Sequence, residues 1–258
     1  MRRIIPLFVS LLLALVLASP AAAITNGQPD GSQHPYVGMV YNDTYLCSGT
    51  LIAPTVFVTA AHCTAAFEAG GSQVYVTFAP EADFDPANAL PGTPFTYPGF
   101  CIGCAPGLPG FDTDDVGVVV LDAPYVDVGF GQLPYAGQVS DLENGTILTA
   151  VGYGVRGFER GGGPPQPSGI AVRYVAPVQF INDNNRIGDM FIKHSANPAQ
   201  AKGGTCFGDS GGPIFAPDQA TVLGATSFGT NSVCAGTGYA QRLDRPEILE
   251  WIASFIVW

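Results

Sequence analysis

The sequence predicts an all-β protein built as barrels or a sandwich, with one helix at its C-terminal end. Three observations support this prediction. Gly contributes 33 and Pro 22 of the 258 residues, which indicates many turns. Short apolar segments with the length of strands lie between these turns. Apolar residues make up 47% of the chain and charged residues only 12%, so the chain can bury a large core.

Ten apolar segments, taken in chain order, are predicted to be strands. The first five are 37–40, 50–52, 56–60, 74–78 and 116–121. The second five are 147–151, 170–178, 190–193, 213–215 and 222–227. Two stretches rich in Pro and Gly, 81–113 and 156–169, are predicted to be long loops. Many short strands with almost no helical periodicity are typical of barrels and sandwiches.

The last residues of the chain carry the one clear helical pattern. Asp244 and Glu247 have the spacing of a capping box, and Pro246 suits the first turn of a helix. Apolar residues then recur with helical spacing and predict one buried face, formed by Ile248, Leu249, Ile252, Phe255 and Ile256. We therefore expect a helix within residues 244–258.

Residues 1–23 are predicted to be a secretory signal peptide. Arg2 and Arg3 give a positive start, residues 4–18 are apolar, and residues 21–23 form a small-residue cleavage site. The alternative is a membrane anchor, but this apolar run is shorter than the roughly 20 residues that a span needs. We expect a secreted, extracellular protein with no membrane contact after cleavage. The net charge of −11 argues against nucleic-acid binding.

Six cysteines fit an exported protein, because disulfides persist outside the reducing cytosol. The sequence alone does not choose among the possible pairings. Cys101 and Cys104 form a C-x-x-C motif, which elsewhere serves redox or metal chemistry. No second C-x-x-C and no nearby histidine accompany it. We therefore interpret the motif as a local bridge within a loop.

The hexapeptide GDSGGP at 208–213 is the most specific motif in the chain. A nucleophilic serine must lie on a tight, exposed turn that a substrate carbonyl can approach. Glycines on both sides allow the unusual backbone angles of such a turn, and its N–H groups can stabilise an oxyanion. Ser210 is therefore the candidate nucleophile. The alternative interpretation is a Gly-rich surface turn without catalytic function.

A nucleophilic serine needs a base, and the base needs an orienting carboxylate. The three histidines are His34, His62 and His194, and His62 directly follows an apolar strand. The other two are predicted to be surface or loop histidines. Asp115 opens the buried strand 116–121, where an unpaired carboxylate would be costly. The preceding Asp112 and Asp114 are predicted to be solvated loop charges, with Asp114 the weaker alternative for the orienting role.

These motifs together resemble the chymotrypsin-like (trypsin-like) serine proteases. SGTLIAP at 48–54 leads into TAAHC at 59–63, and DVGVVVL follows at 115–121. GYG at 152–154, GDSGGP at 208–213, SFG at 227–229 and the terminal helix complete the set. The order is that of the family: His, Asp, then Ser. The resemblance covers most of residues 24–258 and excludes the two long loops.

The resemblance implies two six-stranded antiparallel β-barrels with the active site in the cleft between them. The barrels are expected at 24–130 and 131–243, followed by the terminal helix at 244–258. Ser210 would be the nucleophile, His62 the base and then the acid, and Asp115 the group that orients the imidazole. The backbone N–H groups of Gly208 and Ser210 would form the oxyanion hole. The expected activity is that of a secreted serine endopeptidase acting through an acyl-enzyme.

The resemblance also implies a substrate pocket and disulfide pairs. The floor of the pocket would lie at Gly204 and Thr205, and its walls at Gly229 and Gly238. Ser227, Phe228 and Gly229 would pair with the substrate backbone. A pocket floor without a carboxylate predicts a preference for substrates with a large apolar or aromatic residue before the scissile bond. The alternative is a broad or collapsed pocket, because Phe207 and the short 230–237 loop could fill it. Cys47 would pair with Cys63 and Cys206 with Cys234. Cys101 and Cys104 would pair locally or stay reduced.

The family matures when cleavage exposes an amino terminus that pairs with a buried aspartate. Here the new amino terminus would be Ile24 and the buried aspartate would be Asp209. Signal peptidase itself would expose Ile24. The alternative is cleavage one or two residues earlier, followed by trimming. No cofactor or metal is expected, and Glu81, Asp83 and Asp85 are interpreted as solvated. We expect a monomer that binds polypeptide substrates and protein inhibitors. The alternative functions are a catalytically silent secreted binding protein on the same fold and a serine esterase.

Overall fold

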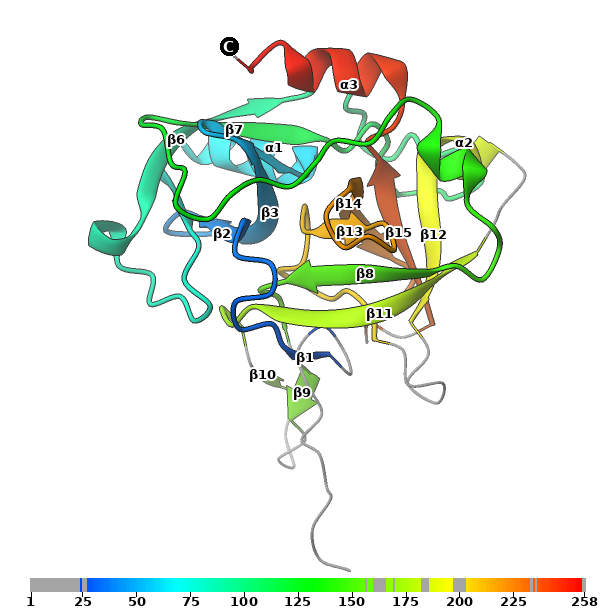
Figure 1. Ribbon diagram of the computed structural model, residues 1–258, viewed down its shortest axis with the longest axis horizontal. Coiled ribbons are helices and arrows are strands. Elements are labelled where there is room, and N and C mark those ends of the chain that lie inside the picture. The colour runs from blue at the N-terminus through cyan, green and yellow to red at the C-terminus, as the bar shows by residue number, and fades with distance from the viewer. Residues whose placement is uncertain are drawn as a thin grey trace, which may run out of the picture.

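The structure is a computed structural model, and it describes residues 24, 27–155, 157–159, 166–168, 170–181, 186–196, 203–232, 234 and 236–256 (Figure 1). The predicted signal peptide lies outside the described residues. Among the residues that are described, no helix is both long enough and apolar enough to cross a membrane.

Six antiparallel strands close a barrel in the first half of the chain, in the order β2-β3-β4-β7-β6-β5. Their bounds are β2 Val37–Tyr41, β3 Leu46–Ala53, β4 Val56–Thr59, β5 Val74–Thr77, β6 Leu90–Thr96 and β7 Gly117–Leu121. Val40, Leu51, Phe57, Val76 and Val119 are fully buried inside it. Burial of each such side chain stabilises the fold by roughly 1.5–3 kcal/mol.

The second half of the chain forms another antiparallel sheet. Its strands are β8 Ile147–Gly152, β11 Tyr174–Ile181, β12 Phe191–Ala196, β13 Pro213–Phe215, β14 Val222–Gly229 and β15 Gly236–Arg242. Pairing runs β11-β12-β15-β14-β13-β8, and β8 also pairs with β11, so these six strands form a closed ring. The two-residue strand β1, Gln28–Pro29, adds to β11. The prediction of two six-stranded barrels is confirmed.

Two strands of the barrels lie where the sequence does not predict them. β6 lies inside the predicted loop 81–113. The sequence does not predict this strand, because Pro91, Gly92 and Pro94 interrupt its strand pattern. A Cβ at Gly92 would lie 2.8 Å from Val119, so glycine permits the close approach of β7. β15 is the other unpredicted strand, since its sequence GTGYAQR has little apolar alternation. Within the predicted loop 156–169, β9 Gly157–Glu159 pairs with β10 Gln166–Ser168.

The structure contains two α-helices that the sequence analysis does not predict, α1 (Ala61–Gly70) and α2 (Arg186–Met190). α1 begins directly after β4 and ends at Gly71, which has a left-handed φ of 64°. Its buried residues, Ala61, Cys63, Thr64 and Phe67, do not form an apolar stripe in the sequence. Short 3₁₀ turns occur at Pro86–Asn88 and Gln138–Asp141.

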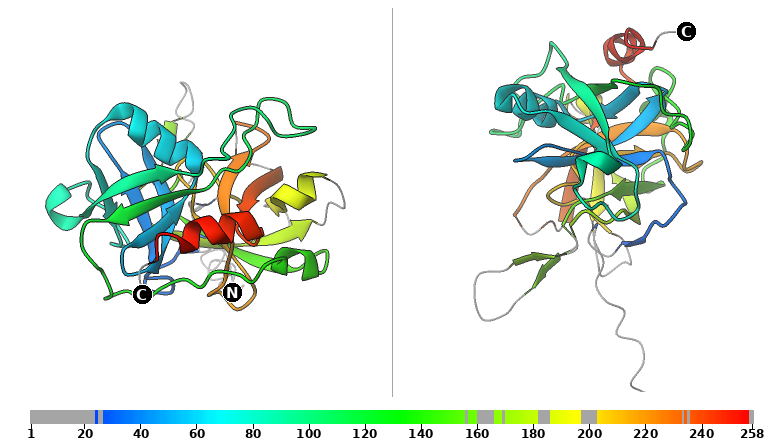
Figure 2. Two further views of the ribbon diagram at one scale, coloured as in Figure 1. Left: turned by 90° about the horizontal axis from the view of Figure 1, so that it is seen from above. Right: turned by 90° about the vertical axis from the view of Figure 1, so that its left-hand side faces the viewer.

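The predicted C-terminal helix is confirmed as α3, Pro246–Ala253, although it is shorter than expected. The predicted cap is wrong. Asp244 does not cap the helix, because its carboxylate accepts hydrogen bonds from Arg242 and from the Val139 N–H at 2.8 Å. The helix packs on the first barrel, and its ring contacts are Trp251 with Tyr97 and Phe255 with Phe95. Figure 2 shows α3 lying across the end of the molecule.

Candidate active site

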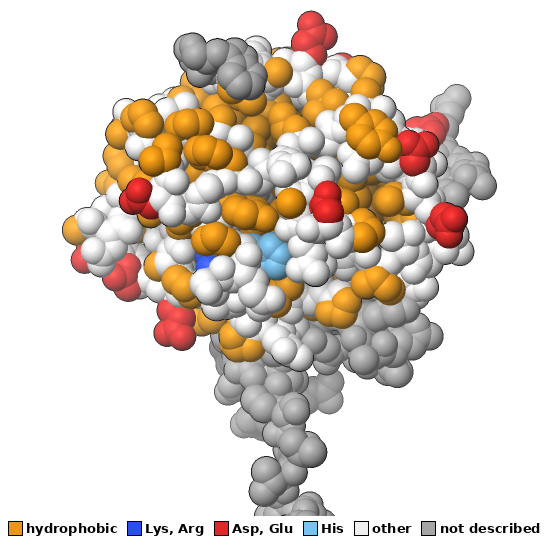
Figure 3. Space-filling view, in the orientation of Figure 1, with side chains coloured by type: hydrophobic (Ala, Val, Ile, Leu, Met, Phe, Trp, Pro, Cys, Tyr) orange, Lys and Arg blue, Asp and Glu red, His pale blue; other side chains and the backbone are white. Residues whose placement is uncertain are grey.

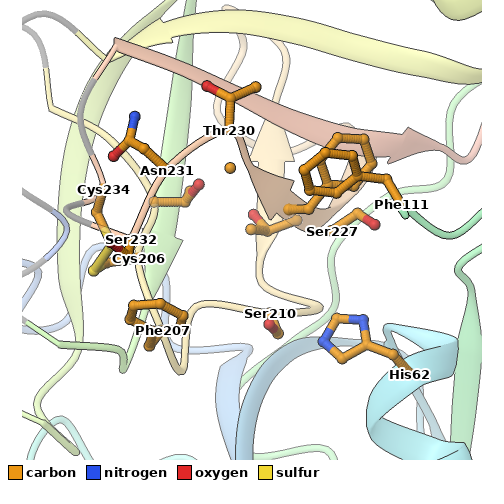
Figure 4. Close-up of a pocket in the computed structure, with 14 residues that line it drawn as sticks. His62, Phe111, Cys206, Phe207, Ser210, Ser227, Thr230, Asn231, Ser232 and Cys234 are labelled. Carbon is orange, nitrogen blue, oxygen red and sulfur yellow. A yellow bond between two sulfur atoms is a disulfide. The ribbon is translucent and has the colours of Figure 1, made fainter. Parts of the chain in front are cut away.

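Two of the three predicted catalytic residues, His62 and Ser210, line one cavity of about 520 Å³. His62 enters it from the first turn of α1, and Ser210 enters it from the turn before β13. In Figure 4 Ser210 and His62 lie next to each other along one side of the cavity. The face of the molecule drawn in Figure 3 carries many apolar side chains, with acidic groups scattered among them and almost no basic ones.

The serine turn is tight because its glycines allow close backbone approach. Gly208 has φ of 93° and Gly211 has φ of 77°, which are left-handed values. A Cβ at Gly211 would lie 2.1 Å from Thr59 Oγ1, and a Cβ at Gly208 would lie 2.8 Å from Gly154 Cα. The Ser48 hydroxyl joins the two sides by donating to the Gly208 carbonyl at 2.9 Å and accepting from the Tyr153 N–H at 2.9 Å. These contacts fix the turn against both barrels.

Asp209 lies fully buried beneath this turn. Its carboxylate accepts from the N–H groups of Gly154 and Cys206, each at 2.8 Å. A Cβ at Gly152 would lie 2.3 Å from the carboxylate, which explains why the sequence has glycine there. Burial raises the pKa of Asp209 to about 7, although the two backbone hydrogen bonds oppose the shift. No cation is paired with it among the described residues.

Two backbone N–H groups of the serine turn have no hydrogen-bond acceptor in the described part of the chain. They belong to Gly208 and Ser210, whereas the Asp209 N–H donates to Cys206 at 3.0 Å and the Gly211 N–H donates to Thr226 at 2.7 Å. Two free donors beside a candidate nucleophile can stabilise a negative oxygen. The sequence predicts this role for these two groups.

Asp115 is fully buried and holds His62 at two points. The His62 backbone N–H donates to one carboxylate oxygen at 2.8 Å, and Nδ1 donates to the other at 2.8 Å. The Ser227 hydroxyl donates to the same oxygen as Nδ1, at 2.5 Å. With Nδ1 bound in this way, Nε2 is the ring nitrogen left to accept a proton from the serine.

The pKa values of this pair are coupled through their contact. Burial alone would raise the pKa of Asp115, but the charge of His62 and hydrogen bonds from His62 and Ser227 lower it. Burial alone would lower the pKa of His62, but the charge and hydrogen bond of Asp115 raise it. The His62 side chain remains 33% exposed, so it can exchange protons with a bound substrate.

The walls of the cavity include several of the predicted substrate-binding residues. They are Thr205, Ser227, Phe228 and Gly229, and Phe207 lines the cavity as well. Figure 4 shows Phe207 and Ser227 on different sides of the cavity. The cavity contains no acidic residue among those that line it.

Two predicted pocket residues lie outside this cavity. Gly204 is not among the residues that line it, and Gly238 lines a separate recess of about 10 Å³ with Thr205 and Thr237. A Cβ at Gly238 would lie 2.4 Å from the His194 ring, so this histidine fills the space that glycine leaves.

Three disulfides join the six cysteines. They are Cys47–Cys63, Cys101–Cys104 and Cys206–Cys234. The first lies behind His62, and the last borders the cavity. In the chain-entropy model, closing the 16-residue separation between Cys47 and Cys63 stabilises the fold by roughly 3 kcal/mol.

The disulfides remove the cysteine sulfurs from the groups that could bind a metal ion. Cys47, His62 and Cys63 place one ligand atom each within 4.8 Å of one another, but both sulfurs are in a disulfide and offer no thiolate. In the predicted acidic loop, Asp83 accepts hydrogen bonds from the Asp85 N–H at 3.0 Å and from Asn88 at 2.7 Å.

His34 lies in a loop, as predicted, although it is buried with 2% exposure. The surface or loop position predicted for His194 is wrong, because this residue lies in β12 with 0% exposure. His34 contacts the Asp30 carboxylate at 2.5 Å, whereas neither ring nitrogen of His194 has a hydrogen-bond partner among the residues that the structure describes. The prediction for Asp114 is also wrong: this residue forms an ion pair with Arg245 and is only 22% exposed. Local sequence patterns do not reveal the partner of Asp114, since Arg245 lies 131 residues further along the chain.

Other functional contacts escape the sequence analysis altogether. The hydrogen bond from Ser227 to Asp115 spans two barrels and leaves no local signal. Phe111 comes from the predicted loop 81–113 and stacks on Phe228 with ring centroids 4.3 Å apart. Both rings line the cavity beside Ser210. The GYG motif at 152–154 is the one sequence signal that points to the surroundings of Asp209.

The predicted activation residues are both buried, and no ion pair joins them in the part of the chain that the structure describes. Ile24 lies in the core of the second barrel with 0% exposure, and its carbonyl accepts from the Gly27 N–H at 2.6 Å. In this chain the Ile24 nitrogen belongs to a peptide bond, so it carries no charge that could pair with Asp209.

Comparison with known proteins gives consistent matches. Brachyurin from Leptuca pugilator is 27% identical over 229 residues, which cover 82% of this chain and 88% of that protein. Serine protease 1 from Drosophila melanogaster is 28% identical over 240 residues, covering 89% and 84%. Among solved structures, HL collagenase superposes with a TM-score of 0.66 at 17% identity, covering 88% and 96%. Human heparin binding protein gives 0.61 at 20% identity, covering 88% and 94%.

A match to a family model extends over nearly the whole described chain. The model is that of Trypsin, and it matches residues 24–252. This range includes both barrels and every residue that lines the cavity. The chain therefore belongs to the Trypsin family of serine proteases.

Proposed function

We propose that this protein is a secreted serine endopeptidase that cleaves polypeptides through an acyl-enzyme. The observation that carries the proposal is that three features lie at or directly behind the cavity lined by His62 and Ser210. These are the pair of His62 with the buried Asp115, the hydroxyl of Ser210, and the two free N–H groups of Gly208 and Ser210. Together they supply a base, a nucleophile and an oxyanion site.

In the proposed reaction, Ser210 Oγ attacks the substrate carbonyl carbon while His62 Nε2 takes the hydroxyl proton. Asp115 stabilises the resulting imidazolium, and the two N–H groups stabilise the negative carbonyl oxygen. The carbon–nitrogen bond breaks as His62 gives its proton to the leaving amine. Water then attacks the acyl-enzyme, loses a proton to His62, and releases the acid as Ser210 regains its proton.

The cavity supports a preference for large apolar or aromatic residues before the scissile bond. Its walls carry the rings of Phe111, Phe207 and Phe228, and none of its residues is acidic. A substrate Lys or Arg would therefore bury its charge without a partner, which is unfavourable. An aliphatic or aromatic side chain of the substrate carries no charge, so its burial in the cavity does not have this cost.

We also propose that cleavage before Ile24 activates the enzyme. Asp209 is buried, and its pKa is raised to about 7 by that burial. The new amino group at Ile24 would supply the missing positive partner and fix the serine turn above it. Signal peptidase would create this terminus directly.

Two other functions receive less support. A catalytically silent binding protein would not require Asp115 to be buried against His62, as it is. A heparin ligand, suggested by the name of one structural relative, would be repelled by a net charge of −11. An esterase would use the same triad, so only assays with both substrates separate it from a peptidase.

The test of the proposal is casein hydrolysis by the secreted protein and two variants. Ser210→Ala and His62→Ala are each expected to lower kcat by a factor on the order of 10⁶. The control variant is Asp122→Asn, an exposed residue that does not line the cavity. Casein hydrolysis that persists in Ser210→Ala would exclude the proposal, and ester hydrolysis alone would indicate an esterase.

A further inference from the structure

Asp115 lies at the edge of the first barrel, but contacts from the second half of the chain hold it. Its backbone N–H donates to Gln241 Oε1 at 3.2 Å. Gln241 is fully buried in β15, and its amide group donates to the Met190 carbonyl at 3.0 Å. The Ser227 hydroxyl of β14 donates to the Asp115 carboxylate. The position of this carboxylate thus depends on elements outside its own barrel.

The residue before it, Asp114, has a backbone conformation that non-glycine residues rarely adopt. Its φ is 55°, in the left-handed region. Its carbonyl accepts from the Val116 N–H at 2.9 Å, so the chain turns sharply around Asp115. The turn sets the direction in which the Asp115 side chain leaves the backbone. If Asp114 relaxed to an ordinary conformation, that carboxylate would no longer face His62.

Arg245 holds Asp114 from the start of α3. Its guanidinium forms an ion pair with the Asp114 carboxylate, and a second ion pair joins it to Glu247 at 2.5 Å. The Arg245 backbone is fixed as well, because its carbonyl accepts from the N–H groups of Ile248 and Leu249, each at 3.0 Å. Figure 2 shows α3 beside the strands of the first barrel, where such a contact can form.

We propose that Arg245 is a positioning residue for catalysis. Its ion pair keeps Asp114 left-handed and thereby keeps the Asp115 carboxylate directed at His62. This inference rests on the proposed function, since it assigns Arg245 a part in orienting the catalytic base. The alternative is that Arg245 only attaches α3 to the barrel. That role would affect stability but not the turnover of the folded enzyme.

The first test compares Arg245→Ala with Glu247→Gln. Arg245→Ala is expected to lower kcat about tenfold, which corresponds to ~1.4 kcal/mol. KM is expected to stay unchanged, because Arg245 does not line the cavity. Glu247→Gln removes the other ion pair of the same guanidinium and leaves Asp114 paired, so its kcat is expected to match the wild type.

The pH profile separates positioning from a simple loss of charge. Removal of a nearby cation would by itself raise the pKa of His62, because the imidazolium would face less repulsion. Displacement of Asp115 would lower the pKa of His62, because its main stabilising partner moves away. In Arg245→Ala we therefore expect the acidic limb of the kcat profile to move to lower pH.

A suppressor variant gives the sharpest test. Glycine adopts a left-handed φ without strain, so Asp114→Gly makes the ion pair unnecessary. The double variant Arg245→Ala/Asp114→Gly is expected to recover kcat to within about threefold of the wild type. If Arg245→Ala does not fold, Asp114→Gly and Asp114→Ala replace it. Both lose the ion pair, but only the alanine variant is expected to show the tenfold loss.

Several results would overturn the inference. Wild-type kcat in Arg245→Ala or in Asp114→Ala would do so, as would a loss of kcat that Asp114→Gly does not rescue. Failure of the proposed function is recognised separately, because the wild-type protein would then not react with a fluorophosphonate at Ser210. The variants are compared only at temperatures below their measured melting points.

Discussion

Replacement of Gly229 by valine tests the proposed substrate pocket by filling it. A Cβ built at Gly229 meets only the Thr237 carbonyl, at 3.9 Å, so the fold has room for a side chain there. That room belongs to the cavity of about 520 Å³ beside Ser210. Valine would therefore occupy space that a large substrate side chain needs, without disturbing the protein core.

The size of the effect follows from the atoms that compete for this space. Loss of room for one methylene costs about 1–3 kcal/mol in a hydrophobic pocket, or roughly 10–200-fold in kcat/KM. Valine adds three carbons, so kcat/KM for a substrate with Phe before the scissile bond is expected to fall about 100-fold. A substrate with Ala at that position is expected to change less than threefold.

The assay measures kcat/KM for matched peptide substrates that differ only in this residue. The melting temperature of Gly229→Val serves as the control and is expected to stay within about 2 °C of the wild type. An unchanged preference for Phe in a stable Gly229→Val enzyme would show that the substrate side chain binds elsewhere. The assignment of the pocket would then be wrong.

Three further predictions follow from the buried charges. Because Asp115 raises the pKa of His62, kcat/KM should rise with pH around a midpoint above the ordinary ~6.5; a midpoint at or below that value contradicts the coupling. In a chain with one extra residue before Ile24, Asp209 keeps a raised pKa of about 7, so the folded state binds more protons than the unfolded state. The free energy of unfolding of this extended chain, measured in urea, should fall as pH rises from about 4 to 7, and Asp209→Asn should remove that dependence. A free energy of unfolding that does not change over this pH range in the extended chain would refute the raised pKa of Asp209. Arg173→Met should cost about 3–5 kcal/mol in the same assay, because it removes the guanidinium that lies 2.9 Å from the buried Asp30 carboxylate and leaves that carboxylate with His34 alone; a loss below 1 kcal/mol would contradict this prediction.

The sequence predicts the barrel architecture because most strands are buried and therefore apolar. β7 is an example, since GVVVL is buried along nearly its whole length. β6 and α1 are not predicted for a physical reason. β6 carries two prolines and a glycine, and its stability comes from pairing with β5 and β7. α1 is positioned by packing and by the disulfide at Cys63 rather than by an apolar stripe.

The candidate site likewise contains features that the sequence predicts and features that it does not. The turn around Ser210 is visible in the sequence because its glycines are required by close backbone contacts. The carboxylate partner of His62 is visible because Asp115 opens a buried strand. Contacts between distant segments are not visible in this way. Neither the Arg245–Asp114 ion pair nor the stacking of Phe111 on Phe228 has a signal in local composition.

The central claim is that Ser210 is a nucleophile activated by His62. The most direct measurement is the rate of covalent labelling by a fluorophosphonate, with the modified residue located by peptide mass spectrometry. We predict a single adduct on Ser210, a rate that rises with pH as His62 loses its proton, and no adduct in Ser210→Ala or His62→Ala. An unlabelled Ser210 in the secreted wild-type protein, or labelling that persists in His62→Ala, would contradict the account.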